Sequence, residues 1–260
     1  MKMKPLRILV SNDDGIFAPG IFALARSLSE LGEVIVVAPD RQQSAVGHAI
    51  TMHSPVRVYP FHVNGTMFGY AIDGTPADAV KFAVRNIMKD NPPDVLVSGI
   101  NHGSNTAVNV IYSGTVSAAT EGAILGIPSI AVSLTTYDTP DFRYSAKFAR
   151  NLTEVVAQKG LPPGTVLNVN VPNVPENEIQ GVVVTRQGRS NWDDYYEKRL
   201  DPGKREYYWL TGALQVLDNE EDIDQVAIIN KKVSVTPIHY DLTNYNVLNQ
   251  LRSWDLETLK

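Results

Sequence analysis

Two adjacent acidic residues, Asp13 and Asp14, follow a short apolar run in the segment VSNDDG. The nearest preceding basic residue, Arg7, lies at the far end of that run, so no neighbouring cation in the sequence offsets their repulsion. Asp-Gly commonly forms a turn and an aspartate can cap a following helix, which would explain one acid structurally. A divalent cation between the carboxylates is the simplest explanation for the pair.

Further polar residues follow two other apolar runs of strand length. The second run leads into APDRQQSAVGH, with Ser44, Gly47 and His48, and the run DVLVSGIN ends at Asn101, followed by HGSN. The carboxyl ends of parallel strands meet at one edge of a sheet, so we expect these residues to converge there. Aspartate, serine and asparagine oxygens suit a hard cation such as Mg²⁺, Mn²⁺ or Ca²⁺, whereas the five histidines lack the spacing of a zinc motif.

The segment YSGTVSAATEG has the residues that a phosphate site needs. Ser113, Gly114 and Thr115 stand at a predicted helix start, where unpaired amides and the helix dipole favour an anion. Capping of the helix by Ser113 or Thr115 is the alternative explanation. In DGTPADAV, by contrast, helix-start chemistry is sufficient, so we expect Asp73 and Asp78 to be structural.

The elements that would position these residues alternate along the chain. Residues 7–12 and 33–40 read as continuous buried strands on either side of a helix over 19–32, which predicts a βαβ unit of a parallel sheet. The pattern then continues with helices over 75–90, 113–127 and 141–160 and strands over 94–101, 129–134 and 165–172. We therefore predict an α/β fold with a Rossmann-like, doubly wound, mostly parallel sheet and a ligand site at its carboxyl edge.

Two regions break this alternation. Residues 49–73 contain the turn signal VNGT between β-rich runs and predict a β-hairpin excursion. The tail has the strand candidates GVVVTRQ, EYYWL and KKVSVTPIHYDL around a charged, aromatic stretch. We predict a catalytic core over residues 1–178 and, over 179–260, a β-rich arm and oligomerisation region that partly returns to the core.

Composition and motifs exclude several classes of protein. A net charge of −5 does not favour nucleic acid as a partner. The absence of cysteine excludes disulfides, thiolate metal sites and a cysteine nucleophile. The turn after the first strand carries two acids instead of G-x-G-x-x-G, which argues against a dinucleotide despite Asp40 at the end of the second strand. The apolar run at residues 7–10 is too short for a signal-peptide core, and we expect a soluble, cytoplasmic protein without a membrane partner.

Taken together, five segments resemble the SurE, or stationary-phase survival protein, family of metal-dependent nucleotidases. The resemblance covers about residues 7–137 in order and spacing and is looser in LNVNVP, VTRQG and VSVTPIHYDLT. The five segments are ILVSNDDG, VVAPDRQQSAVGHAIT, DGTPADAV, DVLVSGINHGSN and YSGTVSAATEGAILGIPSIAVS.

The resemblance implies a phosphomonoesterase that hydrolyses nucleoside 5'- and 3'-monophosphates and, in some members, short polyphosphate. It implies one divalent cation per subunit, Mg²⁺ or Mn²⁺ first and Ca²⁺ or Co²⁺ as alternatives, and a homodimer or homotetramer formed through the C-terminal arm. The family's metal ligands fall on Asp13, Asp14, Ser44 and Asn101, and its phosphate-contacting turn falls on Ser113, Gly114 and Thr115.

For the hydrolysis itself we expect water to attack phosphorus in line with the leaving ribose oxygen. Asp14 is our candidate general base; Asp13 as a covalent nucleophile is the alternative, but NDDG does not match the D-x-D of haloacid-dehalogenase phosphatases. Candidates for supporting the ligands are Asn12, Gly47, His48, His102 and Asn105.

Two other classes of protein compete with this hypothesis. A metal-dependent, non-catalytic binding module resembling a receiver domain would need an aspartate at the end of the third core strand, where the chain has Asn101. A glycosyltransferase-like nucleotide-sugar enzyme would fit the first βαβ unit but normally needs a second domain of similar size. Rapid, metal-dependent hydrolysis of 4-nitrophenyl phosphate would distinguish a phosphatase from both.

Overall fold

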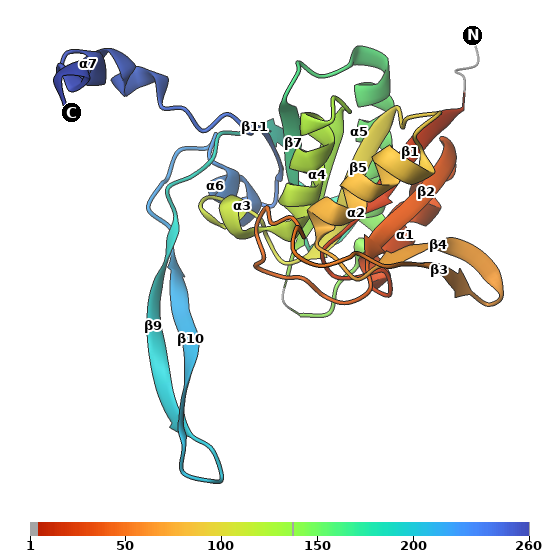
Figure 1. Ribbon diagram of the computed structural model, residues 1–260, viewed down its shortest axis with the longest axis horizontal. Coiled ribbons are helices and arrows are strands. Elements are labelled where there is room, and N and C mark those ends of the chain that lie inside the picture. The colour runs from red at the N-terminus through yellow and green to blue at the C-terminus, as the bar shows by residue number, and fades with distance from the viewer. Residues whose placement is uncertain (1–4, 137, 260) are drawn as a thin grey trace.

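The computed structural model describes residues 5–136 and 138–259 and shows a nine-stranded, mostly parallel sheet covered by helices on both faces (Figure 1). Residue 137, where the resembling region ends, lies outside the described residues. The strand order is β3-β4-β2-β1-β5-β6-β7-β11-β8. The strands are β1 (Leu6–Ser11), β2 (Gly32–Pro39), β3 (Val58–Val63), β4 (Thr66–Ile72), β5 (Val95–His102), β6 (Ser129–Thr135), β7 (Thr165–Pro172), β8 (Val182–Val184) and β11 (Val233–His239).

The predicted alternation of strands and helices is confirmed, and so is the α/β fold class. The helices are α1 (Pro19–Leu28), α2 (Pro76–Phe82), α3 (Asn109–Tyr112), α4 (Gly114–Ile124), α5 (Phe142–Lys159), α6 (Asp224–Ile229) and α7 (Leu248–Arg252). A π-helical turn, η1 (Ala83–Ile87), continues α2, and three short 3₁₀ turns are η2 (Glu176–Glu178), η3 (Tyr245–Val247) and η4 (Leu256–Thr258). None of the described helices is both long enough and apolar enough to cross a bilayer.

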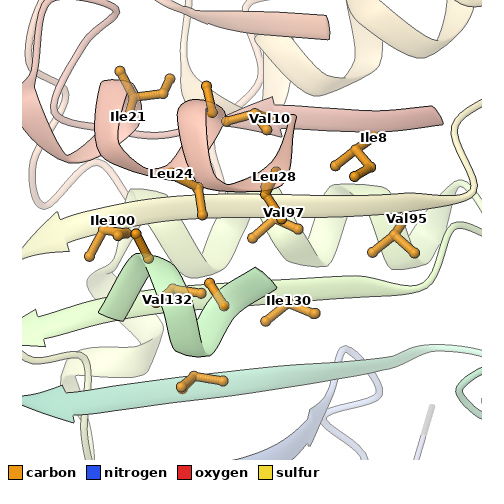
Figure 2. Close-up of a cluster of buried hydrophobic side chains, with 14 of the residues drawn as sticks. Ile8, Val10, Ile21, Leu24, Leu28, Val95, Val97, Ile100, Ile130 and Val132 are labelled. Carbon is orange, nitrogen blue, oxygen red and sulfur yellow. The ribbon is translucent and has the colours of Figure 1, made fainter. Parts of the chain in front are cut away.

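The central strands are apolar on both faces because helices cover both. Ile8 and Val10 of β1 belong to the core under α1 and α5, and Figure 2 shows them with Leu24 and Val97 in this layer. Leu9, between them, points to the opposite core under α2 and α4. Continuous apolar strands therefore reflect a sheet buried on both sides, as the sequence predicted.

The connections diverge at β1. After β1 the chain moves to β2 on one side, and it later returns to place β5 on the other side, with both strands parallel to β1. This divergence makes the carboxyl ends of β1 and β5 the switch point of the sheet, where doubly wound folds bind ligands.

The predicted hairpin over 49–73 is present as β3 and β4. Asn64 and Gly65 both adopt positive φ angles, +50° and +80°, which is the conformation of the turn that the NG signal predicts. β4 pairs parallel with β2, so the hairpin extends the main sheet at its edge instead of leaving it.

The C-terminal region has two kinds of structure. β11 pairs antiparallel with β7 and parallel with β8, so both join the main sheet. A separate two-stranded hairpin, β9 (Asn191–Leu200) and β10 (Glu206–Gln215), projects far from the body, and the segment with α7 also extends away from it (Figure 1). A hairpin thus occupies much of the stretch 186–230; the domain boundary at residue 178 stays a prediction.

Candidate functional site

The two aspartates and Asn101 lie at the switch point of the sheet. Asp13 and Asp14 directly follow β1, and Asn101 lies near the end of β5, the strand beside it. The pairing of β5 with β6 is irregular between Ser98 and Asn101, and Gly99 lies so close to the Val132 carbonyl that a Cβ would be 2.4 Å from its oxygen. The regular pairing of β5 with β6 is thus interrupted immediately before Asn101.

One cavity of about 430 Å³ collects most of the predicted residues. Asp13, Ser44, Asn101 and Ser113 line it together, although they come from four separate segments of the chain. Asp14 instead lines a neighbouring cavity of about 320 Å³, and Gln42 and His102 line both cavities. The remaining lining residues of the first cavity are Ala45, Gly103, Ser104, Asn105, Asn109, Tyr112 and Trp192.

Asp13 is held by the first turn of α4. Its side chain is 3% exposed, and its carboxylate accepts a hydrogen bond from the Thr115 hydroxyl. Gly114 packs so closely that a Cβ there would lie 2.6 Å from Asp13 Cβ. Burial raises the pKa of Asp13 to about 6; the hydrogen bond from Thr115 opposes this shift and the charge of Asp14 adds to it.

Asp14 is less enclosed and has different partners. Its Oδ2 accepts a hydrogen bond from the backbone amide of His102 at 3.1 Å, and Gln42 Nε2 lies 3.4 Å from Oδ1. Burial raises the pKa of Asp14, while His102 and Gln42 oppose the shift. Among residues 5–136 and 138–259, no lysine or arginine side chain contributes to either pKa shift, so the two carboxylates rely on neutral donors and on His102.

Ser44 and Asn101 present oxygens to the same cavity. Gln42 Nε2 donates to the Ser44 hydroxyl at 2.8 Å, which links Ser44 to the partner of Asp14. Asn101 Nδ2 donates to the Gly103 carbonyl at 2.8 Å, and this leaves Oδ1 as the amide atom that could bind a cation.

The predicted phosphate turn has a more divided role than the sequence suggested. Ser113 caps α4 by accepting a hydrogen bond from the Val116 amide at 3.1 Å, and its own hydroxyl proton stays available. The Thr115 side chain is fully buried and its hydroxyl serves Asp13. Ser113 is therefore the member of this turn whose side chain lines the cavity, and phosphate binding by residues 113–115 stays a prediction.

Gly47 and His48 fix the loop that carries Ser44. The Gly47 amide donates to the Tyr112 carbonyl at 3.0 Å, and Gly47 adopts a φ of +64°, which glycine permits without strain. His48 Nε2 lies 3.0 Å from Glu121 Oε2, and Lys81 Nζ lies 2.6 Å from Glu121 Oε1. Because Glu121 belongs to α4, its contact with His48 connects the loop to the same helix that holds Asp13.

Asn105 is clamped by polar side chains of β6 and β7. Its backbone amide donates to Asn170 Oδ1 at 2.8 Å, and its carbonyl accepts from Asn168 Nδ2 at 2.8 Å and Asn170 Nδ2 at 3.1 Å. Its side chain donates to the Ser133 hydroxyl at 2.9 Å. The clamp fixes the loop after β5 that forms one wall of the cavity.

Two other supporting candidates shape the turns beside the aspartates. Asn12 Nδ2 donates to the Gly15 carbonyl at 2.9 Å and thereby closes the NDDG turn. The His102 ring lies 3.0 Å from the Asp138 carbonyl, while its backbone amide serves Asp14. His102 therefore contributes its backbone to the aspartate and its ring to a neighbouring loop.

Several residues that position the site were not predicted from the sequence. Two kinds of polar residue in apolar surroundings could have been detected. Glu121 is fully buried among small apolar residues of α4, and the asparagines of LNVNVP lie in a strand covered on both faces. Buried Asp224 accepts from the amides of Ala107, Gly188 and Gln225, and burial raises its pKa. Gln42 and Trp192 gave no signal, because only the tertiary fold brings them to the cavity.

A hard divalent cation fits the chemistry of this donor set. Asp13 is nearly inaccessible to water and adjoins a second carboxylate, an arrangement that a cation would stabilise strongly. Over residues 5–136 and 138–259, no group of three or more histidine, cysteine, aspartate or glutamate side chains is placed to hold a metal. A cation here would therefore also need neutral oxygens, and Ser44 and Asn101 offer them.

Fold and site define a doubly wound α/β protein with an acidic, oxygen-lined cavity at the switch point of its sheet. A family profile described as "Survival protein SurE" matches residues 8–194. The chain belongs to the SurE family, as its sequence motifs predicted.

Similar proteins match almost end to end. A protein from Syntrophobacter fumaroxidans named 5'-nucleotidase SurE is 52% identical and aligns over 96% of this chain and 100% of its own length. One from Chlorobaculum tepidum with the same name is 49% identical over 99% and 98% of the two chains. The crystal structure of a SurE protein from Aquifex aeolicus superposes with a TM-score of 0.83, at 43% identity over 95% of this chain and 98% of that chain.

Proposed function

We propose that this protein is a divalent-metal-dependent phosphomonoesterase that hydrolyses nucleoside 5'-monophosphates to nucleoside and phosphate. The observation that carries the proposal is the cavity at the switch point, where Asp13, Ser44, Asn101 and Ser113 meet next to Asp14. The name 5'-nucleotidase, given to relatives about 50% identical over nearly the whole chain, supports this choice of substrate.

In this proposal Asp13, Asp14, Ser44 and Asn101 hold one cation, Mg²⁺ or Mn²⁺ before Ca²⁺ or Co²⁺. A bound divalent cation supplies Lewis-acid polarisation of the phosphoryl group and lowers the pKa of water. Asp13 is suited to binding because α4 fixes its carboxylate and excludes water from it. The same contacts favour a binding role for Asp13 over that of a covalent nucleophile.

The phosphate group is oriented by the start of α4. The Ser113 hydroxyl can donate to a phosphoryl oxygen, and the helix dipole favours the negative charge that develops there. Asp14 is the general base: it is only partly buried and lines the cavity next to the one that holds Asp13, so its carboxylate can accept a proton from water there. His102 and Gln42, which line both cavities, donate to its carboxylate and hold it in place.

Two extensions of the activity belong to the same proposal. A 3'-monophosphate presents the same phosphoryl group with the sugar reversed, and the cavity volume of about 430 Å³ is in the usual range for a small-molecule site. Short polyphosphate needs only the cation and the anion-binding helix start. We include both as further substrates.

The deciding measurement is phosphate release from AMP at neutral pH, with Mn²⁺ or Mg²⁺ and with EDTA, for wild type and Asp13→Asn. We expect turnover that requires metal and falls by at least about 100-fold in the folded variant. Absence of phosphate release from AMP, 3'-AMP and polyphosphate with every divalent metal would overturn the enzyme hypothesis. Metal-dependent AMP binding without turnover would then favour a non-catalytic nucleotide-binding module.

The C-terminal region supports a homodimer or homotetramer. Large apolar side chains are exposed along the β9–β10 hairpin, including Tyr196 and Trp209, and beyond β11, where Leu242 is 90% exposed. Apolar surface of this extent on segments that project from the body is typical of an interface with another copy. A cytoplasmic location, expected from the cysteine-free sequence, stays a prediction.

A further inference from the structure

The cavity at the switch point has two aromatic residues that the proposed chemistry does not use. Tyr112, at the end of α3, and Trp192, at the start of β9, both line it beside Asp13, Asn101 and Ser113. These two residues are 57% and 37% exposed. Each ring therefore has surface that a flat ligand could cover.

The Trp192 indole is held in place, and so is the backbone of Tyr112. The Trp192 indole N–H donates to Asn109 Oδ1 at 3.1 Å, which fixes the indole against α3. The Tyr112 carbonyl accepts the Gly47 amide at 3.0 Å, and Tyr112 directly precedes Ser113. An indole fixed in the cavity that Ser113 of the proposed phosphate-binding turn also lines loses little conformational freedom when a ligand stacks on it.

We propose that Trp192 and Tyr112 bind the nucleobase of the substrate and so make the enzyme prefer nucleotides over other phosphate monoesters. The inference rests on the proposed function and assigns the part of the substrate that the metal and phosphate sites leave unbound. Purines and pyrimidines stack on aromatic side chains whatever their hydrogen-bonding pattern, so this site fits a broad range of bases. Asn109 keeps its Nδ2 free of the indole and can donate to an acceptor on the base edge.

The neighbouring cavity offers a competing aromatic surface. Phe17 lines it with Phe142, is 64% exposed and packs edge-on against Phe61 at 4.7 Å between ring centroids. This neighbouring cavity contains only one of the predicted metal ligands, Asp14. The first cavity, with Trp192, is lined by Asp13, Ser44, Asn101 and Ser113. A base attached to a phosphate in the first cavity therefore reaches Tyr112 and Trp192 more directly than Phe17.

The test compares AMP with ribose 5-phosphate, which has the same phosphate and sugar without the base. With saturating Mn²⁺, kcat/KM is measured for wild type, Trp192→Ala, Trp192→Phe and Tyr112→Ala, with Phe17→Ala as the matched aromatic control. We expect Trp192→Ala to lower kcat/KM for AMP by about 5- to 150-fold, mainly through KM, and to change that for ribose 5-phosphate less than about threefold. Trp192→Phe should retain most of the preference for AMP.

Three results would overturn the proposal: equal losses on both substrates, an unchanged kcat/KM for AMP, or a base-selective loss in Phe17→Ala instead of Trp192→Ala. If wild type hydrolyses neither substrate, the proposed function fails and calorimetry with the Mn²⁺-loaded protein decides the inference. Tighter binding of AMP than of ribose 5-phosphate that disappears in Trp192→Ala would support the base site. Equal binding of the two compounds would exclude it.

Discussion

The Thr115 hydroxyl donates a hydrogen bond to the Asp13 carboxylate, although 102 positions separate them in the chain. Both side chains are buried, so this bond sets the direction in which Asp13 presents its other oxygen. It also explains why Thr115, expected to contact phosphate, turns its side chain inward.

Replacement of Thr115 by valine is expected to weaken metal binding. Valine has nearly the same shape but cannot donate to Asp13, so the carboxylate loses its orientation. Titration with Mn²⁺ in the absence of substrate should show an affinity about 10- to 100-fold lower. Thr115→Ser keeps the hydroxyl and should stay within about threefold of wild type; equal affinities for all three proteins would contradict the role given to this bond.

Asp13→Asn should stabilise the protein when metal is removed. The pKa of Asp13 is raised from 3.8 to about 6, so the folded state binds more protons than the unfolded state between these values. Stability of the chelated wild type should therefore fall as pH rises from about 4 through about 6, by about 2 to 3 kcal/mol. The asparagine variant avoids this loss.

In EDTA at pH 7.5, thermal unfolding of Asp13→Asn should occur about 4 to 10 °C above that of wild type. At pH 4 the two midpoints should nearly coincide, which serves as the internal control. If the variant is less stable than chelated wild type at pH 7.5, burial of the charged Asp13 side chain does not destabilise the folded state.

Gly114→Ala is expected to abolish most activity without unfolding the protein. The new Cβ would lie 2.6 Å from Asp13 Cβ and 2.9 Å from its Oδ2, so the aspartate or the helix start must move. Misplacement of a ligand by about 1 Å can cost about 100-fold in rate. Thr120→Ala removes a hydroxyl from the same helix, bonded to the Val116 carbonyl, and should change phosphate release less than about twofold.

Glu121→Gln should loosen the loop that carries Ser44. Burial alone would raise the pKa of Glu121, but hydrogen bonds from His48 and Lys81 outweigh it and lower the pKa, so the charged form stabilises the fold above pH 4.5. Loss of the charge should cost about 1 to 2 kcal/mol at pH 7, because His48 and Lys81 remain partly exposed to water. Hydrogen exchange should quicken in residues 40–57.

The control for this prediction is Lys147→Met, which breaks an exposed pair between Lys147 of α5 and Glu176 of η2. Exposed pairs contribute little, so stability and exchange in residues 40–57 should stay at wild-type values. Equal exchange in Glu121→Gln and wild type would contradict the link between the loop and α4.

Removal of residues 240–260 should shift the protein to a smaller oligomer. This segment follows β11 and exposes Leu242, Trp254 and Leu259. Light scattering coupled to size exclusion would measure the mass, and circular dichroism would check that the main sheet stays folded. An unchanged oligomer would assign assembly to the β9–β10 hairpin instead.

The main sheet and the position of the aspartate pair at its edge could be predicted from the sequence, because the patterns that indicate them are local. Apolar runs such as the one that precedes Ser11 indicate strands buried on both faces. The NG turn indicates the hairpin formed by β3 and β4. Thr75 and Asp78 form the expected capping box at the start of α2. Each of these patterns depends on residues a few positions apart.

The contacts that orient the site residues could not be predicted from such local patterns. Asn170 holds Asn105 from 65 positions away, and Glu121 holds His48 from 73. Such pairs depend on the order of strands in the sheet, because strand order decides which loops become neighbours. A polar residue in a buried segment shows that a partner exists, but it does not identify that partner.

Helix α4 touches the site at three places: Thr115 fixes Asp13, Ser113 lines the cavity, and Glu121 anchors the loop of Ser44. Its Ala118 and Ala119 are fully buried in the same core as Leu96 of β5. Helix α4 thus sets the relative position of two loops that are not consecutive in the chain. Any substitution that tilts this helix against the sheet would displace both sides of the cavity at once, even if the substituted residue does not contact substrate.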